Sequence, residues 1–220
     1  MLGVKQGCVL APVIFNIFLV AVTLAFRSGI LTEDGVGLSY RLDGSLFNLR
    51  RLKAKSKTLK ECVFELQYAD DAALPSHTAA GLQRSLDRIC EAYQRSGLVV
   101  NVKKTEILSQ IQQLSTAQPM FTVSSAPLAN VQQFTYLGSI LTSDCDITHE
   151  VNRQIQLAST AFGRLSHRVF LSISTKVAVY NAMCVSVLLF GCETWKLYRR
   201  HLRALEDYHI KSVHKILGLH

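Results

Sequence analysis

The sequence predicts an α+β protein, in which a mixed part of strands and helices is followed by a mainly helical part. Hydrophobic residues make up 49% of the 220 residues and charged residues 18%, which is typical of a globular chain with a buried core. Short apolar runs separated by turn residues continue to about residue 142. Beyond Asp144 the apolar residues recur at helical spacing. We therefore expect two domains, 1–145 and 146–220.

The net charge of +8 favours polyanionic partners, of which nucleic acid is the usual one and a membrane surface the alternative. The six cysteines form no Cys-x-x-Cys pair and no Cys/His cluster, so their spacing indicates neither a zinc site nor a disulfide framework. Reduced, buried thiols are typical of an intracellular protein. We expect a nuclear or cytoplasmic protein that is not secreted.

Residues 8–26 are almost wholly apolar, with Lys5 before them and Arg27 after them. Such a run also fits a signal peptide or a short membrane span. Pro12 and Asn16 interrupt it, and no small-residue cleavage site precedes Arg27. We favour a loop that leads into a fully buried helix, because proline suits the first turn of a helix. A secreted or membrane-anchored protein is the alternative.

The next residues predict a hairpin followed by a basic segment. Residues 38–42 and 45–49 are strand candidates joined by Asp43-Gly44, which supplies the positive φ of a tight turn. Residues 50–60 hold six cations and no acidic residue. This segment is either a solvated loop or a patch that binds phosphates, and the pattern does not separate the two.

Residues 63–74 predict two short strands around Asp70-Asp71, and their apolar flanks should bury these strands. A helix should begin after Thr78 and end before Gly97, which suits a C-cap. Its apolar stripe consists of Leu82, Leu86, Ile89 and Tyr93. Further strands are expected at 98–100 and 106–108 around a polar turn at 101–105, and at 121–123 and 134–141.

The part after Asp144 is predicted to be helical and basic. From Glu150 onward there are ten Lys/Arg and four Asp/Glu. Residues 176–190 are apolar almost throughout, but they are too few to span a membrane as a helix. Two apolar stripes are expected, one of Val151, Ile155, Ala158, Phe162 and Leu165 and one of Leu202, Leu205, Val213 and Ile216.

The Asp70-Asp71 pair is the main candidate for chemistry. Two adjacent carboxylates repel each other, so a fold that keeps both at a tight turn favours a bound cation. The alternative is that Asp-Asp only makes a polar turn. Near the C-terminus, Trp195 and Tyr198 lie beside Lys196 and Arg199-Arg200 and can stack on bases, although packing of Trp195 in the core is the simpler interpretation.

Five motifs occur in an order that resembles the palm of reverse transcriptases from non-LTR (LINE-type) retrotransposons. Each is weak alone, but their order and spacing together are specific, and the resemblance covers essentially the whole chain. The motifs are 3–12, Tyr68-Ala69-Asp70-Asp71, 97–105, Phe134-Thr135-Tyr136-Leu137-Gly138 and 189–195. The resemblance implies a partial polymerase palm, an antiparallel sheet with packed helices, followed by a thumb-like helical region.

The resemblance also implies roles for individual residues. Asp70 and Asp71 match the pair that helps to hold Mg²⁺ ions, and Asp70 is the stronger candidate for a direct ligand. Lys103 or Lys104 matches a lysine that neutralises or protonates pyrophosphate. Residues implied to contact the template or the incoming deoxynucleotide are Gln6, Gly7 and Tyr68. The implied primer grip is Tyr136, Leu137 and Gly138, and the implied partners are an RNA template and a DNA primer.

Two departures from the family pattern bear on activity. Val9 stands where the family usually has proline, which is a mild change. The family also has a catalytic aspartate upstream of the loop that corresponds to Gln6 and Gly7, whereas Glu33, Asp34 and Asp43 follow that loop here. We therefore expect a fragment of an RNA-directed DNA polymerase that is inactive alone. A non-enzymatic remnant of a retroelement that binds nucleic acid is the alternative.

Overall fold

The computed structural model describes residues 7–41, 58–110, 120–166 and 171–219. The chain divides into two compact units, one formed by Met1–Glu106 with Ser115–Ala129, the other by Ile107–Leu114 with Asn130–His220. Each unit combines helices with small sheets, as the α+β prediction expects. The assignment of 1–145 to a palm and 146–220 to a thumb-like region stays a prediction.

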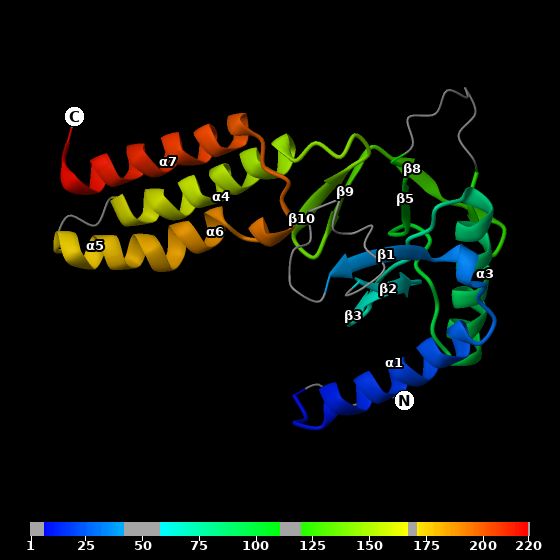
Figure 1. Ribbon diagram of the computed structural model, residues 1–220. Helices are drawn as coiled ribbons and strands as arrows, with labels where there is room; N and C mark the ends of the chain where they lie inside the picture. The colour runs from blue at the N-terminus through cyan, green and yellow to red at the C-terminus, as the bar shows by residue number, and fades with distance from the viewer. Residues whose placement is uncertain (1–6, 42–57, 111–119, 167–170, 220) are drawn as a thin grey trace. The chain divides into compact units, whose positions relative to one another are not determined.

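In the first unit, the described helices α1 and α3 pack against each other (Figure 1). The described strands of this unit pair antiparallel, β1 with β2, β3 with β4, and β6 with β7. Its elements in chain order are α1 (Ala11–Arg27), η1 (Thr32–Asp34), β1 (Val36–Arg41), β2 (Thr58–Val63), β3 (Leu66–Tyr68), β4 (Asp71–Ala73), α3 (Ala79–Arg95), β6 (Thr122–Val123) and β7 (Ala126–Pro127).

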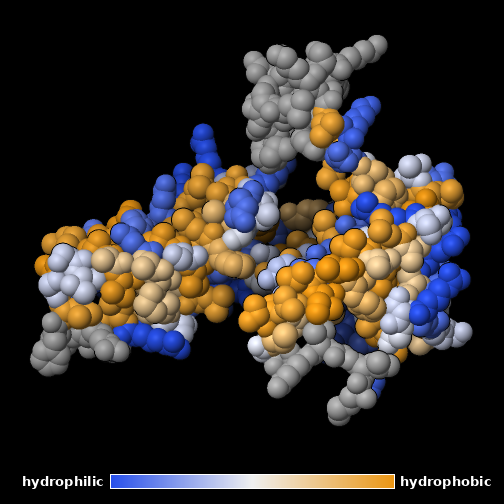
Figure 2. Space-filling view, turned by 90° about the horizontal axis from the view of Figure 1, so that it is seen from below, coloured by the Kyte–Doolittle hydropathy of each residue, from blue (hydrophilic) through white to orange (hydrophobic). Residues whose placement is uncertain are grey.

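Helix α1 forms where it was predicted, with Pro12 in its first turn, but the expectation that it is fully buried is wrong. Only Leu19, Val22 and Phe26 are buried, at spacings of three and four, because α1 packs with a single stripe. Figure 2 shows apolar side chains gathered over this helix. Its exposed apolar residues are Val13, Ile14, Ile17, Phe18, Val20 and Leu24. In the described parts of the chain, no helix combines the length and apolar character that crossing a membrane requires.

Helix α3 confirms its predicted ends and its apolar stripe. The Thr78 hydroxyl accepts a hydrogen bond from the Gly81 amide at 3.0 Å and so caps the first turn. Gly97 has a φ of 75°, the left-handed conformation that glycine adopts most readily after a helix. Leu86 and Ile89 are buried on the stripe.

The described strands differ from prediction in two places, and a further predicted strand lies outside the described residues. The described partner of β1 is β2, and the strand expected at 45–49 lies outside the described residues. Residues 98–100 are not a strand, and Val99 is 90% exposed. Residues 134–141 belong to a hairpin of two strands rather than one strand. The described strands form five two-stranded sheets, not one larger sheet.

The second unit combines short strands with three packed stretches of helix (Figure 1). Strand β5 begins in the first unit, at Glu106, and pairs with β8. The elements are β5 (Glu106–Leu108), β8 (Ala129–Val131), β9 (Gln133–Tyr136), β10 (Ser139–Thr142), α4 (Thr148–Ser166), α5 (Ile173–Val179), the π-helical η2 (Tyr180–Val185), α6 (Ser186–Leu188), η3 (Cys192–Thr194) and α7 (Arg199–Leu217).

The helices of this unit bury two apolar clusters. Phe162 and Leu165 of α4 pack with Tyr180, Cys184 and Ile216, which confirms the predicted α4 stripe. Val151, Ala158, Leu188 and Leu205 form the other cluster, against which Trp195 packs. Leu202 was predicted to lie on the apolar face of α7 but is 44% exposed, because the first turn of α7 points His201 inward instead.

Candidate functional site

The aspartate pair lies at the end of the β3–β4 hairpin. Tyr68 pairs with Asp71, so Ala69 and Asp70 form a two-residue loop, and Ala69 has a left-handed φ of 51°. Tyr68, Asp70 and Asp71 are all exposed. The two predicted strands are thereby confirmed, but their predicted burial is wrong, since Leu66 and Tyr68 are 51% and 66% exposed.

The hairpin fits a hydrated divalent cation better than a fully protein-bound one. Mg²⁺ in proteins commonly takes one or two carboxylates and keeps several waters or substrate oxygens. The two exposed carboxylates of Asp70 and Asp71 are a donor set of that kind. Within the residues that the structure describes, no group of three or more His, Cys, Asp or Glu side chains is placed to hold a metal.

The two candidate lysines lie in the turn that follows α3. Asn101 builds this turn, because its side-chain oxygen accepts the Lys103 amide at 3.2 Å and its carbonyl accepts the Lys104 amide at 3.0 Å. Both lysines are exposed. Their ammonium groups are free to meet an anionic group, but no described hydrogen bond or ion pair joins them to Asp70 or Asp71.

The N-terminal loop is described only in part. Gln6 lies outside the described residues. Gly7 is exposed, has a φ of 86°, and a Cβ built on it would meet no atom within 4 Å. The backbone conformation therefore favours glycine at this position.

Two of the predicted primer-grip residues, Leu137 and Gly138, form the turn between β9 and β10, and the third, Tyr136, is the last residue of β9. Leu137 and Gly138 have φ angles of 48° and 85°, as a tight hairpin turn requires. Arg153 of α4 donates to the Gly138 carbonyl at 2.6 Å. A Cβ on Gly138 would lie 3.2 Å from the Phe190 ring. The chain thus makes a hairpin turn at the position of the predicted primer grip. Arg153 and Phe190 of the same unit both contact this turn.

A buried carboxylate fixes the first residues of β10, and the sequence analysis missed it. Glu150 is 2% exposed and accepts the Ile140 amide at 2.8 Å and the Gln154 side-chain amide at 2.8 Å. Arg153 lies 3.7 Å from the same carboxylate. The available signal was Glu150 and Gln154 spaced i, i+4 beside the apolar stripe of α4, where solvated side chains are not expected.

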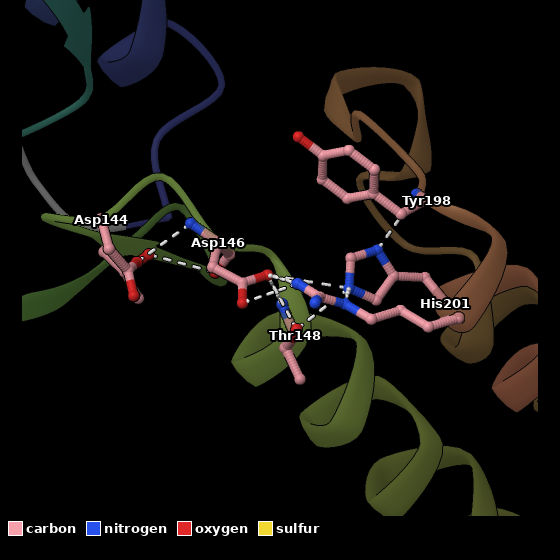
Figure 3. Close-up of polar contacts among 7 residues, drawn as sticks. Asp144, Asp146, Thr148, Tyr198 and His201 are labelled. Carbon is pink, nitrogen blue, oxygen red and sulfur yellow. Dashed lines mark hydrogen bonds and ion pairs between the residues drawn. The ribbon is translucent and has the colours of Figure 1, made fainter.

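A second missed cluster joins the start of α4 to the start of α7, and Figure 3 shows His201 turned towards Thr148. Thr148 donates to Asp146 at 2.7 Å and contacts the His201 Nε2 at 3.0 Å. The Tyr198 amide donates to His201 Nδ1 at 3.3 Å, and Arg200 donates to both Asp146 oxygens at 3.0 and 2.9 Å. Hydrogen bonds from Thr148, then the Arg200 cation, lower the pKa of Asp146.

The contacts of Arg200 in this cluster bear on the base-stacking surface predicted around Trp195 and Tyr198. Trp195 packs against the apolar core, as the simpler interpretation expects. Arg200 forms an ion pair with Asp146, and its guanidinium also lies 5.6 Å from the Tyr198 ring centre. Tyr198 itself is 53% exposed. Asp146, Thr148 and His201 satisfy one another's polar groups. We therefore interpret the cluster as a structural contact between the start of α4 and the start of α7.

Much of the chain is similar in sequence to known proteins. The family model described as reverse transcriptase (RNA-dependent DNA polymerase) matches residues 1–141. A Caenorhabditis elegans protein described as transposon-derived is 20% identical over 157 residues, which cover 70% of this chain and 56% of that protein. The chain therefore spans little more than half the length of this curated relative. No solved structure matches the chain. The chain belongs to the reverse transcriptase family.

Proposed function

We propose that this chain is part of an RNA-directed DNA polymerase from a non-LTR retrotransposon. In this proposal 1–145 is a partial palm and 146–220 a thumb-like region. The observation that carries it is the exposed Asp70-Asp71 pair on a two-residue hairpin, within the region that matches the reverse transcriptase family. The order of the other motifs along the chain supports the retrotransposon subtype.

The proposed reaction is addition of deoxynucleotides to a DNA primer on an RNA template. Asp70 and Asp71 would hold Mg²⁺, which in such sites activates the primer 3′-hydroxyl and stabilises the leaving pyrophosphate. Lys103 or Lys104 would neutralise or protonate pyrophosphate. Gln6, Gly7 and Tyr68 would contact the template or the nucleotide, and the turn at 136–138 would hold the primer end.

We further propose that this polypeptide alone does not polymerise. Two-metal transfer needs a carboxylate cluster with fixed geometry, and the described residues offer Asp70 and Asp71 without a third acidic ligand beside them. The test is extension of a DNA primer on an RNA template with Mg²⁺. No extension is expected. Template-dependent extension that disappears in Asp70→Asn would overturn the proposed inactivity while supporting the proposed reaction.

A non-enzymatic nucleic-acid-binding remnant is the second candidate, and the basic helical part favours it. Arg199, Arg203, Lys211 and Lys215 of α7 are exposed, and α7 carries only Glu206 and Asp207 as acids. Affinity for an RNA–DNA hybrid should fall steeply with salt if these cations meet phosphates. Charge reversal of Arg203 and Lys211 should weaken binding, whereas Asp70→Asn should not. Absence of binding at low salt would exclude this candidate. Either function implies a nuclear or cytoplasmic location.

A further inference from the structure

Strand β3 turns its polar side chain inward and its apolar side chains outward. Leu66 and Tyr68 are exposed, whereas Gln67 between them is partly buried. This reverses the usual alternation of a strand with one buried face. A polar side chain placed inward needs hydrogen-bond partners, because an unpaired buried amide is costly.

Gln67 finds those partners on two different helices. Thr23 of α1 donates to the Gln67 Oε1 at 3.1 Å. The Gln67 Nε2 donates to the Tyr93 hydroxyl of α3 at 3.3 Å. One amide therefore uses its acceptor on α1 and its donor on α3, and it ties β3 to these two helices.

A second attachment lies two residues earlier. The Glu65 side chain is 6% exposed and lies 3.7 Å from the Arg27 guanidinium of α1. Burial raises the pKa of Glu65, and the Arg27 cation and a hydrogen bond with Thr23 oppose that shift. Thr23 and Arg27 lie one helical turn apart on α1, so the contacts of Gln67 in β3 and of Glu65, just before β3, both reach the same end of α1.

Among the described residues, no hydrogen bond or ion pair holds the side chain of Asp70 or Asp71 in a comparable way. Asp70 and Asp71 are exposed, and Asp71 is positioned through its pairing with Tyr68, the residue that follows Gln67. Strand β3 has three residues and the loop has two, so few backbone contacts in the hairpin itself set the orientation of the two aspartate side chains. Groups that bind a metal work only when the surrounding contacts hold them in place.

We infer that Gln67 is a positioning residue for Asp70 and Asp71, acting through its hydrogen bonds to Thr23 on α1 and Tyr93 on α3. This inference rests on the proposed metal-binding role of the pair. Gln67 does not touch the metal or the substrate. Loss of its amide leaves the carboxylates present but allows the hairpin to shift relative to both helices.

The test is the affinity of the full chain for Mn²⁺, measured by electron paramagnetic resonance of the free ion. Gln67→Leu should weaken binding about tenfold, the scale on which supporting residues affect metal affinity. Tyr93→Phe removes one partner and should weaken it in the same direction. Amide hydrogen exchange should become faster at Tyr68 and Asp71 in both variants.

Gln83→Leu is the matched control. Gln83 lies on α3 and bonds the backbone of Thr122 in β6 at 2.9 and 3.1 Å, so it ties a different hairpin of the same unit. This variant should lose stability comparably but keep the Mn²⁺ affinity of the unsubstituted chain. A general loss of stability therefore cannot imitate the effect expected for Gln67→Leu.

Asp70→Asn distinguishes the metal-binding role of Asp70 and Asp71 from the positioning role of Gln67. If Asp70→Asn leaves Mn²⁺ affinity unchanged, the metal-binding role of the pair is wrong, and the role of Gln67 falls with it. If Asp70→Asn weakens binding while a folded Gln67→Leu chain binds normally, only the positioning role is wrong. Should Gln67→Leu fail to fold by circular dichroism, Tyr93→Phe decides in its place.

Discussion

The Glu150 carboxylate accepts the Ile140 amide at 2.8 Å although its side chain is almost completely buried. This bond joins α4 to the strand that follows the predicted primer-grip turn. A buried carboxylate that bonds a strand amide stabilises one position of that strand, since no water can replace it. The turn at 136–138 is therefore held by the helix that follows it in the chain.

Removing this carboxylate should destabilise the hairpin. Glu150→Ala leaves the Ile140 amide and the Gln154 side chain without their partner, so we expect a loss of about 1–3 kcal/mol in the free energy of unfolding. Urea unfolding measures it, and hydrogen exchange should accelerate at Ile140. Glu206→Ala, at an exposed position of α7, should change stability by less than about 0.5 kcal/mol. Equal effects of the two substitutions would contradict the bond's importance.

Alanine substitutions at two glycines should change the stability of the chain in opposite directions. Gly138 has a φ of 85° and the Phe190 ring at 3.2 Å from an added Cβ, so Gly138→Ala should cost about 1–2 kcal/mol. Gly163 lies inside α4, where an added Cβ would meet nothing within 4 Å, so Gly163→Ala should stabilise by about 0.5–1 kcal/mol. Thermal unfolding of both variants is the measurement, and a stabilising Gly138→Ala would contradict the turn geometry.

Glu65 should make the first unit less stable as the pH rises. Burial raises its folded pKa above the ordinary value of 4.5, so the folded state holds its proton more tightly than the unfolded state. The contribution of Glu65 to stability is therefore fully present below about pH 4.5 and is lost as the pH rises from there through the folded pKa.

Glu65→Gln tests this sign. The variant cannot ionise at this position, so its stability relative to the unsubstituted chain should increase between pH 4 and pH 7. Urea unfolding across that range measures the difference, and Glu91→Gln, at an exposed position of α3, serves as the control. A difference that decreases with pH would mean that the Arg27 ion pair outweighs burial.

The exposed apolar residues of α1 should promote self-association. Ile17 and Leu24 are 66% and 64% exposed, and contiguous apolar surface of this kind drives non-specific contacts. Ile17→Lys together with Leu24→Lys should reduce light scattering at high protein concentration without lowering the unfolding temperature. Leu19→Ala, at a buried position of the same helix, should instead destabilise by about 2–5 kcal/mol. Unchanged scattering in the lysine variant would show that another surface associates.

The sequence predicted the features that depend on local periodicity and turn chemistry. The helix after Thr78, the stripe from Val151 to Leu165 and the hairpin at Asp70 follow from spacing, capping and short apolar runs. The reverse transcriptase family follows from motif order along the chain.

Features that depend on which face meets which neighbour could not be predicted in the same way. An apolar run predicts burial, but it cannot show that a single stripe of α1 is buried among the described residues or that β3 turns Gln67 inward. The bonds of Glu150 to Ile140 and of Thr148 to His201 join residues 10 and 53 positions apart. Such pairs are set by tertiary packing, which the helix and strand propensities of individual residues do not describe.

The central claim is that Asp70 and Asp71 bind a divalent cation, and paramagnetic broadening of backbone amide signals by Mn²⁺ tests it most directly. We expect broadening centred on residues 69–72 in the unsubstituted chain and its loss in Asp70→Asn. The acidic residues Asp144 and Asp146 provide an internal comparison, since hydrogen bonds already occupy both carboxylates. Broadening centred on 144–146, or none at 69–72, would contradict the account.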